Sequence, residues 1–151
     1  MNESKYNAMT IAKWFVAWAS SDEADLSNLK LQKLLYYAQG NWIAREGYPL
    51  FGDDLQAWAH GPVVPSVYRY FKDFKSSDLD LSEDDNFDWS MVDEPTTQFL
   101  IEVWNTYGQF GAWRLRNMTH SETPWIANFR GDESHVVIPK PDLLRHFSAC
   151  A

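Results

Sequence analysis

Few residues have the types and spacing of a catalytic or metal-binding site, and the clearest candidate is His120-Ser121-Glu122. A histidine two residues before a glutamate is the spacing of zinc deaminases. Those enzymes complete their metal site with a Pro-Cys-x-x-Cys element that is absent here, which excludes deamination. His60, together with His120 and Glu122, could still form a site of two histidines and one carboxylate for a metal-dependent hydrolase. Histidines hydrogen-bonded at the ends of secondary-structure elements are the alternative.

Nucleophiles and phosphate-binding loops are equally hard to find. Cys150, the one cysteine, is the penultimate residue, and the chain has neither a Gly-x-Ser-x-Gly elbow nor a glycine-rich phosphate loop. The triplet Arg130-Gly131-Asp132 is short enough to occur by chance in a turn. With no catalytic constellation, we expect a protein that is not an enzyme and that uses no metal or other cofactor.

The composition points to a protein partner. The chain has 21 Asp and Glu against 13 Lys and Arg, a net charge of -8. Nucleic acids and anionic membranes require a basic surface, so neither is an expected partner. The 8 tryptophans and the aromatic share of 16% exceed what one small core needs. We expect some of these rings at the surface, where aromatic side chains anchor protein partners.

Cysteine usage and hydropathy predict a soluble, cytoplasmic protein without membrane insertion. A single cysteine allows no intramolecular disulfide, which suits a reducing cytosol. Residues 1–5 lack the apolar run of a signal peptide, and no window reaches the roughly 18 apolar residues of a membrane helix. The 151 residues fit one domain around one core.

Two helices near the start of the chain show the clearest periodicity. The first runs from about Ala8 to Ala19, with Asn7 as its N-cap. Ser27 or Asn28 caps the second helix, which ends near Glu46. In the stretch 29–42 of this second helix, apolar residues recur at helical spacing and predict one buried face. They are Leu31, Leu34, Leu35, Ala38 and Trp42.

Both flanks of that apolar stripe are polar or aromatic, so we expect the helix to bury one face and present another. One flank holds Lys30, Lys33, Tyr37 and Asn41, and the other holds Gln32, Tyr36 and Gln39.

The middle of the chain changes structure type. Alternation at residues 55–59 predicts a short strand. Residues 60–65 predict a stiff turn, because two prolines fix the backbone, with Pro65 in the first turn of a helix that continues to Lys75. Its inward stripe is Val67, Tyr70, Phe71 and Phe74.

Residues 76–94 are acidic and lack periodicity, which predicts a surface excursion with at most a turn of helix. A solvated loop and a partner-facing acidic arm are both open. The segment has no Asp-x-Asp-x-Asp-Gly loop, which argues against an EF-hand.

The last third returns to regular elements. We expect a helix from Pro95 to Gly108, helices over residues 112–118 and 123–129, a strand over 136–138 and a final helix over 141–147. Thr123 is the expected cap and Pro124 the first residue of the helix at 123–129. The final helix turns Leu143, Leu144 and Phe147 inward. The predicted class is mainly α: a compact single-domain helical fold, residues 1–151, with about five to seven helices and a few short β-strands.

Four blocks in order, residues 29–40, 57–68, 107–108 and 119–125, together resemble the Panacea domain, the SocA-like antitoxin family of bacterial and phage toxin–antitoxin pairs. The resemblance spans about residues 8–147 and implies a largely helical fold without enzymatic activity. It also implies a cognate toxin protein as partner, and in one kind of member delivery of the toxin to a ClpXP-type protease. The family signature falls on Lys30, Leu31, Gln32, Lys33, Leu34, Tyr36, Gln39, Gly40, Gly61, Pro62, Val63, Tyr68, His120, Pro124 and Trp125. Tyr37, Trp42 and His60 depart from residues that are common in the family.

Two roles for the signature residues remain open. In the first, the exposed flank of the helix at 29–42, with Lys33 and Tyr37, and the loop around Gly61-Pro62 form a surface that blocks a toxin. In the second, polar side chains of the helix make buried hydrogen bonds that lock it to the turns at Gly61 and His120. The candidate functions are a neutralising antitoxin, a proteolysis adaptor and a metal-dependent hydrolase that uses His60, His120 and Glu122.

Overall fold

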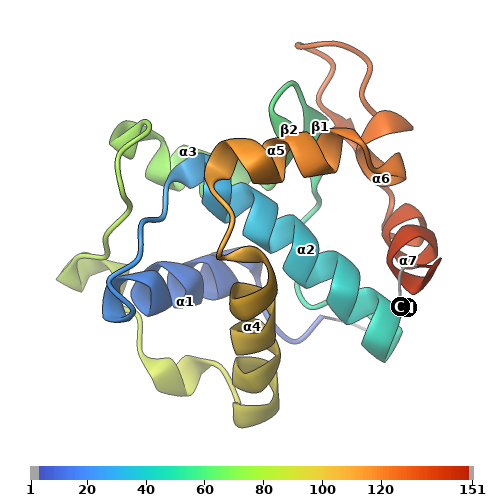
Figure 1. Ribbon diagram of the computed structural model, residues 1–151. Coiled ribbons are helices and arrows are strands. Elements are labelled where there is room, and N and C mark those ends of the chain that lie inside the picture. Colours follow the sequence, from blue (N-terminus) through green and yellow to red (C-terminus); the bar gives the residue numbers. More distant parts are fainter. Residues whose placement is uncertain (1–3, 150–151) are drawn as a thin grey trace.

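The computed structural model describes residues 4–149 and shows a mainly helical fold with a small three-stranded sheet, as predicted. Helix α2 (Asn28–Glu46) runs through the middle of the molecule, and the other elements surround it (Figure 1). The surrounding α-helices are α1 (Ala8–Ser21), α3 (Pro65–Phe71), α4 (Glu94–Tyr107), α5 (Ala112–His120), α6 (Thr123–Ile126) and α7 (Lys140–Ala149). Cys150 lies outside the described residues. No helix in the described range is both long and apolar enough to cross a membrane.

The ends of the first two helices follow local capping signals. The side chain of Asn7 accepts a hydrogen bond from the backbone N–H of Thr10, and Ser27 does the same for Lys30. Gly47 ends α2 at the predicted position. Both helices therefore begin where the sequence predicts, and α1 runs two residues beyond Ala19.

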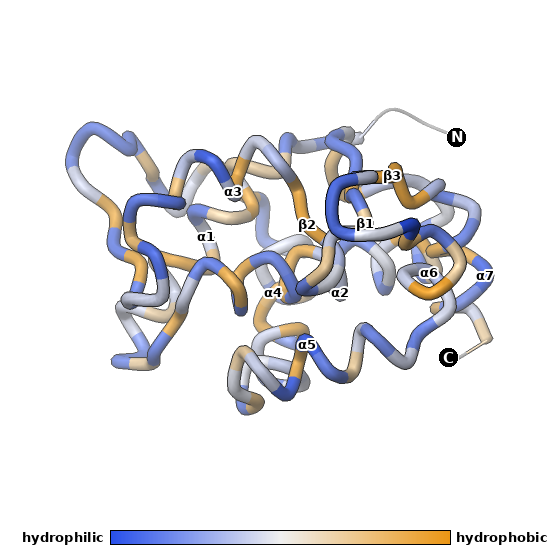
Figure 2. Tube along the Cα trace, turned by 90° about the horizontal axis from the view of Figure 1, so that it is seen from above, coloured by the Kyte–Doolittle hydropathy of each residue, from blue (hydrophilic) through white to orange (hydrophobic). Residues whose placement is uncertain are grey.

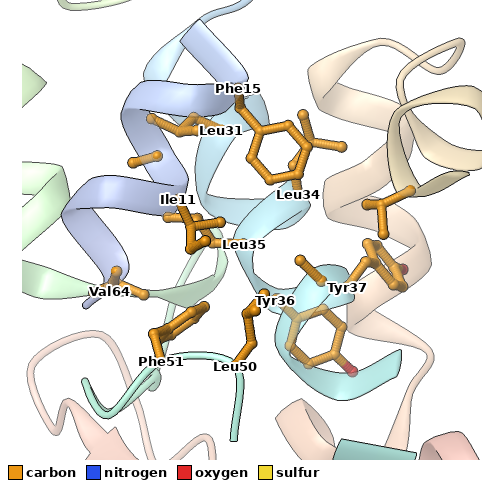
Figure 3. Close-up of a cluster of buried hydrophobic side chains, with 14 of the residues drawn as sticks. Ile11, Phe15, Leu31, Leu34, Leu35, Tyr36, Tyr37, Leu50, Phe51 and Val64 are labelled. Atoms are coloured by element: carbon orange, nitrogen blue, oxygen red, sulfur yellow. The ribbon is translucent and has the colours of Figure 1, made fainter. Parts of the chain in front are cut away.

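Helix α2 is buried on almost all sides, so the prediction that it presents one face to solvent is wrong. Every residue from Lys30 to Gly40 is buried. On one side, Ile11 and Phe15 of α1 pack against Leu31, Leu34 and Leu35 (Figure 3). Elsewhere α4, α5, α7 and strand β2 cover the flanks. The polar residues of α2 must therefore find partners inside the protein.

The sheet has the order β2-β1-β3 and is antiparallel throughout. Its strands are β1 (Gln56–Trp58), β2 (Gly61–Val63) and β3 (Val136–Val137). The predicted turn at 60–65 is therefore shorter, because residues 61–63 pair with β1 and only Ala59 and His60 connect the two strands. Pro62 is tolerated because β2 is an edge strand, which does not need every backbone N–H.

After the hairpin, the predicted long helix is interrupted. Helix α3 stops at Phe71, and a 3₁₀ turn follows over Lys72–Phe74. Lys75 has φ of 55°, which ends helical structure. Val67 and Phe71 point inward as predicted, whereas Tyr70 is exposed. The inward stripe is therefore shorter than its spacing suggests.

The acidic segment 76–94 runs over the surface, with short 3₁₀ helices at Glu83–Asp85 and Trp89–Met91, one more than predicted. Leu79, Asp85 and Val92 are buried and attach it to the body.

The last helices are displaced from their predicted bounds by one to three residues. Asp93 caps α4, so this helix begins one residue before Pro95. Helix α5 extends to His120, whereas α6 is shorter than predicted, because it ends at Ile126. The N-cap of α6 is Glu122 and not Thr123, so Pro124 lies in its first turn but not at the first position. Strand β3 stops at Val137, and Leu144 of α7 is only half-buried.

Candidate functional site

The polar signature residues of α2 bind the backbone of strand β2. The ammonium group of Lys33 donates to the carbonyl oxygen of Pro62 at 2.8 Å. The preceding residue, Gln32, accepts through Oε1 from the N–H of Val64, the residue that follows β2, at 2.9 Å. A helix cannot pair with a strand through its own backbone groups, because those groups are used within the helix. These two side chains therefore satisfy the edge of β2 in place of a neighbouring strand.

Gly61 leaves the space through which Lys33 reaches its acceptor. A β carbon built on Gly61 would lie 2.6 Å from Cε of Lys33 and 2.8 Å from Oγ1 of Thr119. Gly61 also has φ of 111°, which glycine adopts readily and other residues rarely do. The Gly61-Pro62 pair is therefore fitted to a buried lysine, and both residues are buried.

Tyr36 and Tyr37 hold the carboxylate of Glu122 at the start of α6. The hydroxyl of Tyr36 donates to Oε1 at 2.9 Å, and that of Tyr37 donates to Oε2 at 3.0 Å. Nε2 of His146 lies 3.9 Å from Oε1. Each carboxylate oxygen thus has a tyrosine donor, which ties α2 to a residue 85 positions later in the chain.

Lys30 and Gln39 bind two further segments. Lys30 donates to the carbonyl oxygen of Gly108 at 2.6 Å and lies over the ring of Trp104. Gln39 donates to the carbonyl oxygen of Phe51 at 2.8 Å and accepts from the N–H of Leu50 at 2.9 Å. The polar flanks of α2 therefore bind segments on several sides of the helix.

His120 and Trp125 extend this network to the hairpin. Their rings stack with centroids 3.9 Å apart and planes 7° apart. Nε1 of Trp125 donates to the carbonyl oxygen of Trp58 at 2.7 Å. The buried Pro124 directs Trp125 from the first turn of α6. The signature of α6 therefore holds the β1–β2 hairpin in place.

The metal site that the sequence left open does not form. Within residues 4–149, no group of three or more His, Cys, Asp or Glu side chains is placed to hold a metal ion. Glu122 is bound by the two tyrosines, and His120 is stacked on Trp125. His60, His120 and Glu122 therefore do not make the metal site of a hydrolase.

Burial shifts the proton affinities of this network. It lowers the pKa of Lys33 to about 7, and the positive charge of Arg116 acts in the same direction. Burial also raises the pKa of Glu122, although the hydrogen bonds from Tyr36 and Tyr37 oppose this rise. The pKa values of both tyrosines are raised, first by burial and then by the nearby carboxylate. The phenols are therefore held as neutral donors to Glu122.

Most of the predicted site residues lie inside the protein. Lys33 and Tyr37 are fully buried, so the predicted exposed flank is absent from the described structure. Leu31 and Leu34 belong to the core. Tyr68 is the exception, because its side chain is 37% exposed. The signature thus brings most of its members together inside the fold and leaves Tyr68 at the surface.

Tyr68 belongs to a groove of about 790 Å³ that lies over the β1–β2 hairpin and the start of α2. Seen from above, the hairpin lies between α3 on one side and β3 on the other, with α5 alongside (Figure 2). Trp58, Tyr68 and Trp113 contribute large aromatic surfaces, and Trp113 is 59% exposed. The rings of Trp58 and Tyr68 meet edge to face at 5.1 Å, and Trp58 stacks on His135.

The signature network supports this groove from below. Gln32 and Val63 line it, as do Ser27 and Asn28 at the start of α2. Nδ2 of Asn28 in α2 donates to the backbone carbonyl oxygen of Tyr68 in α3, and this hydrogen bond joins two helices that line the groove.

Sequence reasoning missed Trp113, Lys72 and Lys75 as groove residues. The one signal was the excess of tryptophan, which predicted surface rings without saying which ones. Trp113 is the second residue of α5, flanked by Arg114, and such a position on a polar helix suits an exposed ring. Lys72 and Lys75 lie in and directly after the 3₁₀ turn that follows α3, an interruption that the periodicity did not show.

Comparisons with known proteins agree with the resemblance seen in the sequence. The family model described as "Antitoxin SocA-like, Panacea domain" matches residues 31–126, well over half of the chain. A curated relative, "Antitoxin SocA" of Caulobacter vibrioides (strain NA1000 / CB15N), is 42% identical over 65 residues. That alignment covers 43% of this chain and 35% of the relative, so it spans about a third of the relative's length. No solved structure matches the chain.

Proposed function

This chain belongs to the SocA-like antitoxin family of Panacea domains, and from that premise we propose that it binds a cognate toxin protein and neutralises it. The matched residues 31–126 include most of α2, the β1–β2 hairpin, α3 and α5, which contribute most of the groove lining, while Ser27, Asn28, Leu29, Asp132 and His135 lie outside the match. The region matched by the family model thus supplies most of the candidate binding surface.

The observation that carries this proposal is the exposure of large aromatic rings in one groove. Trp113 and Tyr68 leave apolar surface in contact with water, where burial against a partner is favourable. Tryptophan and tyrosine also contribute more binding energy than other residues in protein interfaces. Neutralisation needs only surface complementarity, so a protein binder requires no catalytic group.

The buried network explains how such a groove keeps its shape. The hairpin is held by Lys33 and Gln32 from α2 and by Trp125 from α6. A binding surface that is fixed before the partner arrives loses less conformational entropy on binding. The signature residues therefore serve toxin binding by positioning the groove, and Tyr68 joins the contact directly.

Coexpression tests this function. Each open reading frame beside the gene is expressed from an inducible promoter, with and without this protein, and growth is recorded. We expect one neighbour to arrest growth alone and to be harmless with the protein, and the two purified proteins to elute as one complex. If a toxic neighbour stays toxic and the two proteins elute separately, the proposal is wrong.

An adaptor that delivers the toxin to a ClpXP-type protease would use the same binding step, and it is the alternative mechanism. Direct blockade leaves the half-life of the toxin independent of the protease. An adaptor makes that half-life depend on both the protease and this protein. Pulse-chase measurements in cells with and without the protease distinguish the two mechanisms, because only delivery shortens the half-life.

A further inference from the structure

We propose that the groove binds a toxin segment in which a large apolar side chain lies beside an aspartate or glutamate. The apolar side chain enters between Trp58, Tyr68 and Trp113, and the carboxylate contacts Lys72 and Lys75. The inference rests on the proposed function and specifies the chemistry of its partner.

The floor of the groove offers apolar surface and few directed polar groups. Oδ1 of Asn28 accepts from Gln32, and its Nδ2 donates to the carbonyl of Tyr68. Oε1 of Gln32 accepts from Val64, and Nε1 of Trp58 donates to Gln56. Because these side-chain groups are already bonded, the floor suits an apolar side chain better than a polar metabolite, which needs several aimed donors and acceptors.

The size of the groove fits a short segment of a partner. Its volume of about 790 Å³ lies within the usual range for pockets that enclose a ligand. Anchor residues of protein interfaces fill such recesses, while the surrounding contacts are flatter. One anchor and its neighbours therefore occupy the groove, and the remainder of the toxin lies over the rim.

The cations at the α3 end select the charge beside the anchor. Lys72 and Lys75 are exposed, and neither has an ion-pair partner among residues 4–149. Asp132 lines the groove but pairs with neither lysine. Two unpaired ammonium groups beside apolar rings attract a carboxylate and disfavour another cation.

This local charge runs against that of the molecule. Segment 76–94 contains eight acidic residues and no Lys or Arg, so its formal charge equals the net charge of the whole chain, -8. They are Asp78, Asp80, Glu83, Asp84, Asp85, Asp88, Asp93 and Glu94. The rest of the chain is electrically balanced, and the groove is lined by Lys72 and Lys75 against one carboxylate, Asp132, so its lysine end is suited to an acidic segment.

Panning of a random 12-residue peptide library on the full chain tests the partner chemistry without knowledge of the toxin. We expect enriched peptides to share an aromatic or long aliphatic residue close to Asp or Glu. By fluorescence titration, the best peptide should bind Trp113→Ala about tenfold more weakly than wild type, as expected for loss of an aromatic anchor. Trp89→Ala is the matched control, because Trp89 is an exposed tryptophan outside the groove, and should bind normally.

Charge reversal tests the second half of the proposal. The double variant Lys72→Glu/Lys75→Glu should lose the acidic peptide and gain affinity for the same peptide with Lys in place of its carboxylate. Arg69→Glu is the control, since Arg69 is exposed on α3 and does not line the groove. Thermal unfolding of each variant verifies that it is folded.

Three results would overturn the inference: no enriched peptide, enriched peptides that are basic, or peptide binding that Trp113→Ala leaves unchanged. These results are separable from the failure of the proposed function. If Trp113→Ala and the double lysine variant neutralise a neighbouring toxin as well as wild type does, the groove is wrong and the antitoxin function stands. If the expected peptides bind but no neighbour is neutralised, the binding chemistry stands and the antitoxin function fails.

Discussion

The ring of Phe147 in α7 lies directly against the α carbon of Gly40 in α2. A β carbon built on Gly40 would be 2.1 Å from Cε2 and 2.3 Å from Cδ2 of that ring, far inside van der Waals contact. The absence of a side chain at Gly40 therefore lets α7 pack closely on α2. Gly40 lies within the residues matched by the family model and Phe147 lies beyond them, so the contact joins the shared region to the last helix.

Gly40→Ala should destabilise the protein because the added methyl group overlaps the ring of Phe147. Overpacking of this kind costs about 1–3 kcal/mol, while alanine regains up to about 1 kcal/mol of helix propensity. We expect a net loss in the free energy of unfolding by urea. Phe147→Leu in the same chain should relieve the overlap, so the double variant should be more stable than the two single losses imply.

Gly111→Ala is the control for that substitution. No atom lies within 4 Å of a β carbon at Gly111, and its φ is -70°. Gly111 is the N-cap of α5, where alanine is a poorer residue than glycine, so the loss should be on the order of 0.5–1 kcal/mol, without overpacking. Phe147→Leu should leave the Gly111→Ala loss unchanged and reduce the Gly40→Ala loss. If Phe147→Leu affects both losses equally, the contact between Gly40 and Phe147 is unimportant.

Lys33 should make stability rise with pH in the alkaline range. Its pKa is about 7 in the folded protein, against 10.5 for the free side chain. Between these values the unfolded chain binds more protons than the folded one, so the free energy of unfolding rises with pH by up to about 1.4 kcal/mol per unit. Below pH 7 both states are protonated, and this contribution becomes constant.

Lys33→Met isolates that contribution. Urea unfolding at several values between pH 7 and 9.5 should show a flatter pH dependence for the variant than for wild type. The range stops below the ordinary pKa of tyrosine, because Tyr36 and Tyr37 ionise more readily in the unfolded chain and oppose the trend above it. Parallel curves for the two proteins would mean that Lys33 stays charged in the fold.

Local signals in the sequence predicted the fold well, because Asn7, Ser27 and Gly47 act through contacts within a few residues. The burial of the α2 flanks could not be predicted in this way. Lys33 and Tyr37 look like surface residues until their acceptors, Pro62 and Glu122, are brought to them from 29 and 85 residues away. The groove depends on the same long-range packing. The composition therefore predicted that some aromatic rings would lie at the surface, but it could not identify which ones.

Glu122→Gln should lower the free energy of unfolding, because an amide oxygen can replace only one of the two carboxylate acceptors. We expect a loss of about 1–3 kcal/mol, typical of a buried donor left without a partner. Tyr36→Phe and Tyr37→Phe should each cost less in the Glu122→Gln chain than in wild type, since their acceptor is already altered. Full additivity of these losses in urea unfolding would contradict the shared contact.

The raised pKa of Glu122 gives that substitution a pH dependence of its own. Between 4.5, the ordinary value, and the raised folded value, the folded state binds more protons. The free energy of unfolding of wild type should therefore fall as pH rises through this window and then level off. Glu122→Gln should lack this fall, because an amide does not titrate. Unfolding titrations of both proteins at acid and neutral pH make the comparison.

Asp85 should fasten the acidic segment 76–94, in contrast to its exposed neighbour Asp84. The carboxylate of Asp85 accepts from the hydroxyl of Tyr70 and from the backbone N–H of Ser82, and its carbonyl accepts from Lys13 at 2.7 Å. Asp85→Ala should leave the Tyr70 and Ser82 donors without their acceptor and release the segment locally. Limited proteolysis should then cut within 76–94 several-fold faster than in wild type, and Asp84→Ala should be cut at the wild-type rate.

The pH dependence of the same cleavage follows from the state of Asp85. Burial alone would raise its pKa, but the hydrogen bonds from Tyr70 and Ser82 outweigh burial and lower the pKa below 3.8. The contribution of Asp85 to protection of the segment from cleavage is therefore complete above pH 3.8, and it is lost as the pH falls through the lowered pKa of Asp85 in the folded protein. With an acid-active protease such as pepsin, wild type should resist cleavage in the segment down to about that pH, whereas Asp85→Ala should be cut throughout. Equal rates for wild type and Asp85→Ala above pH 3.8 would show that other contacts, such as buried Leu79 and Val92, hold the segment.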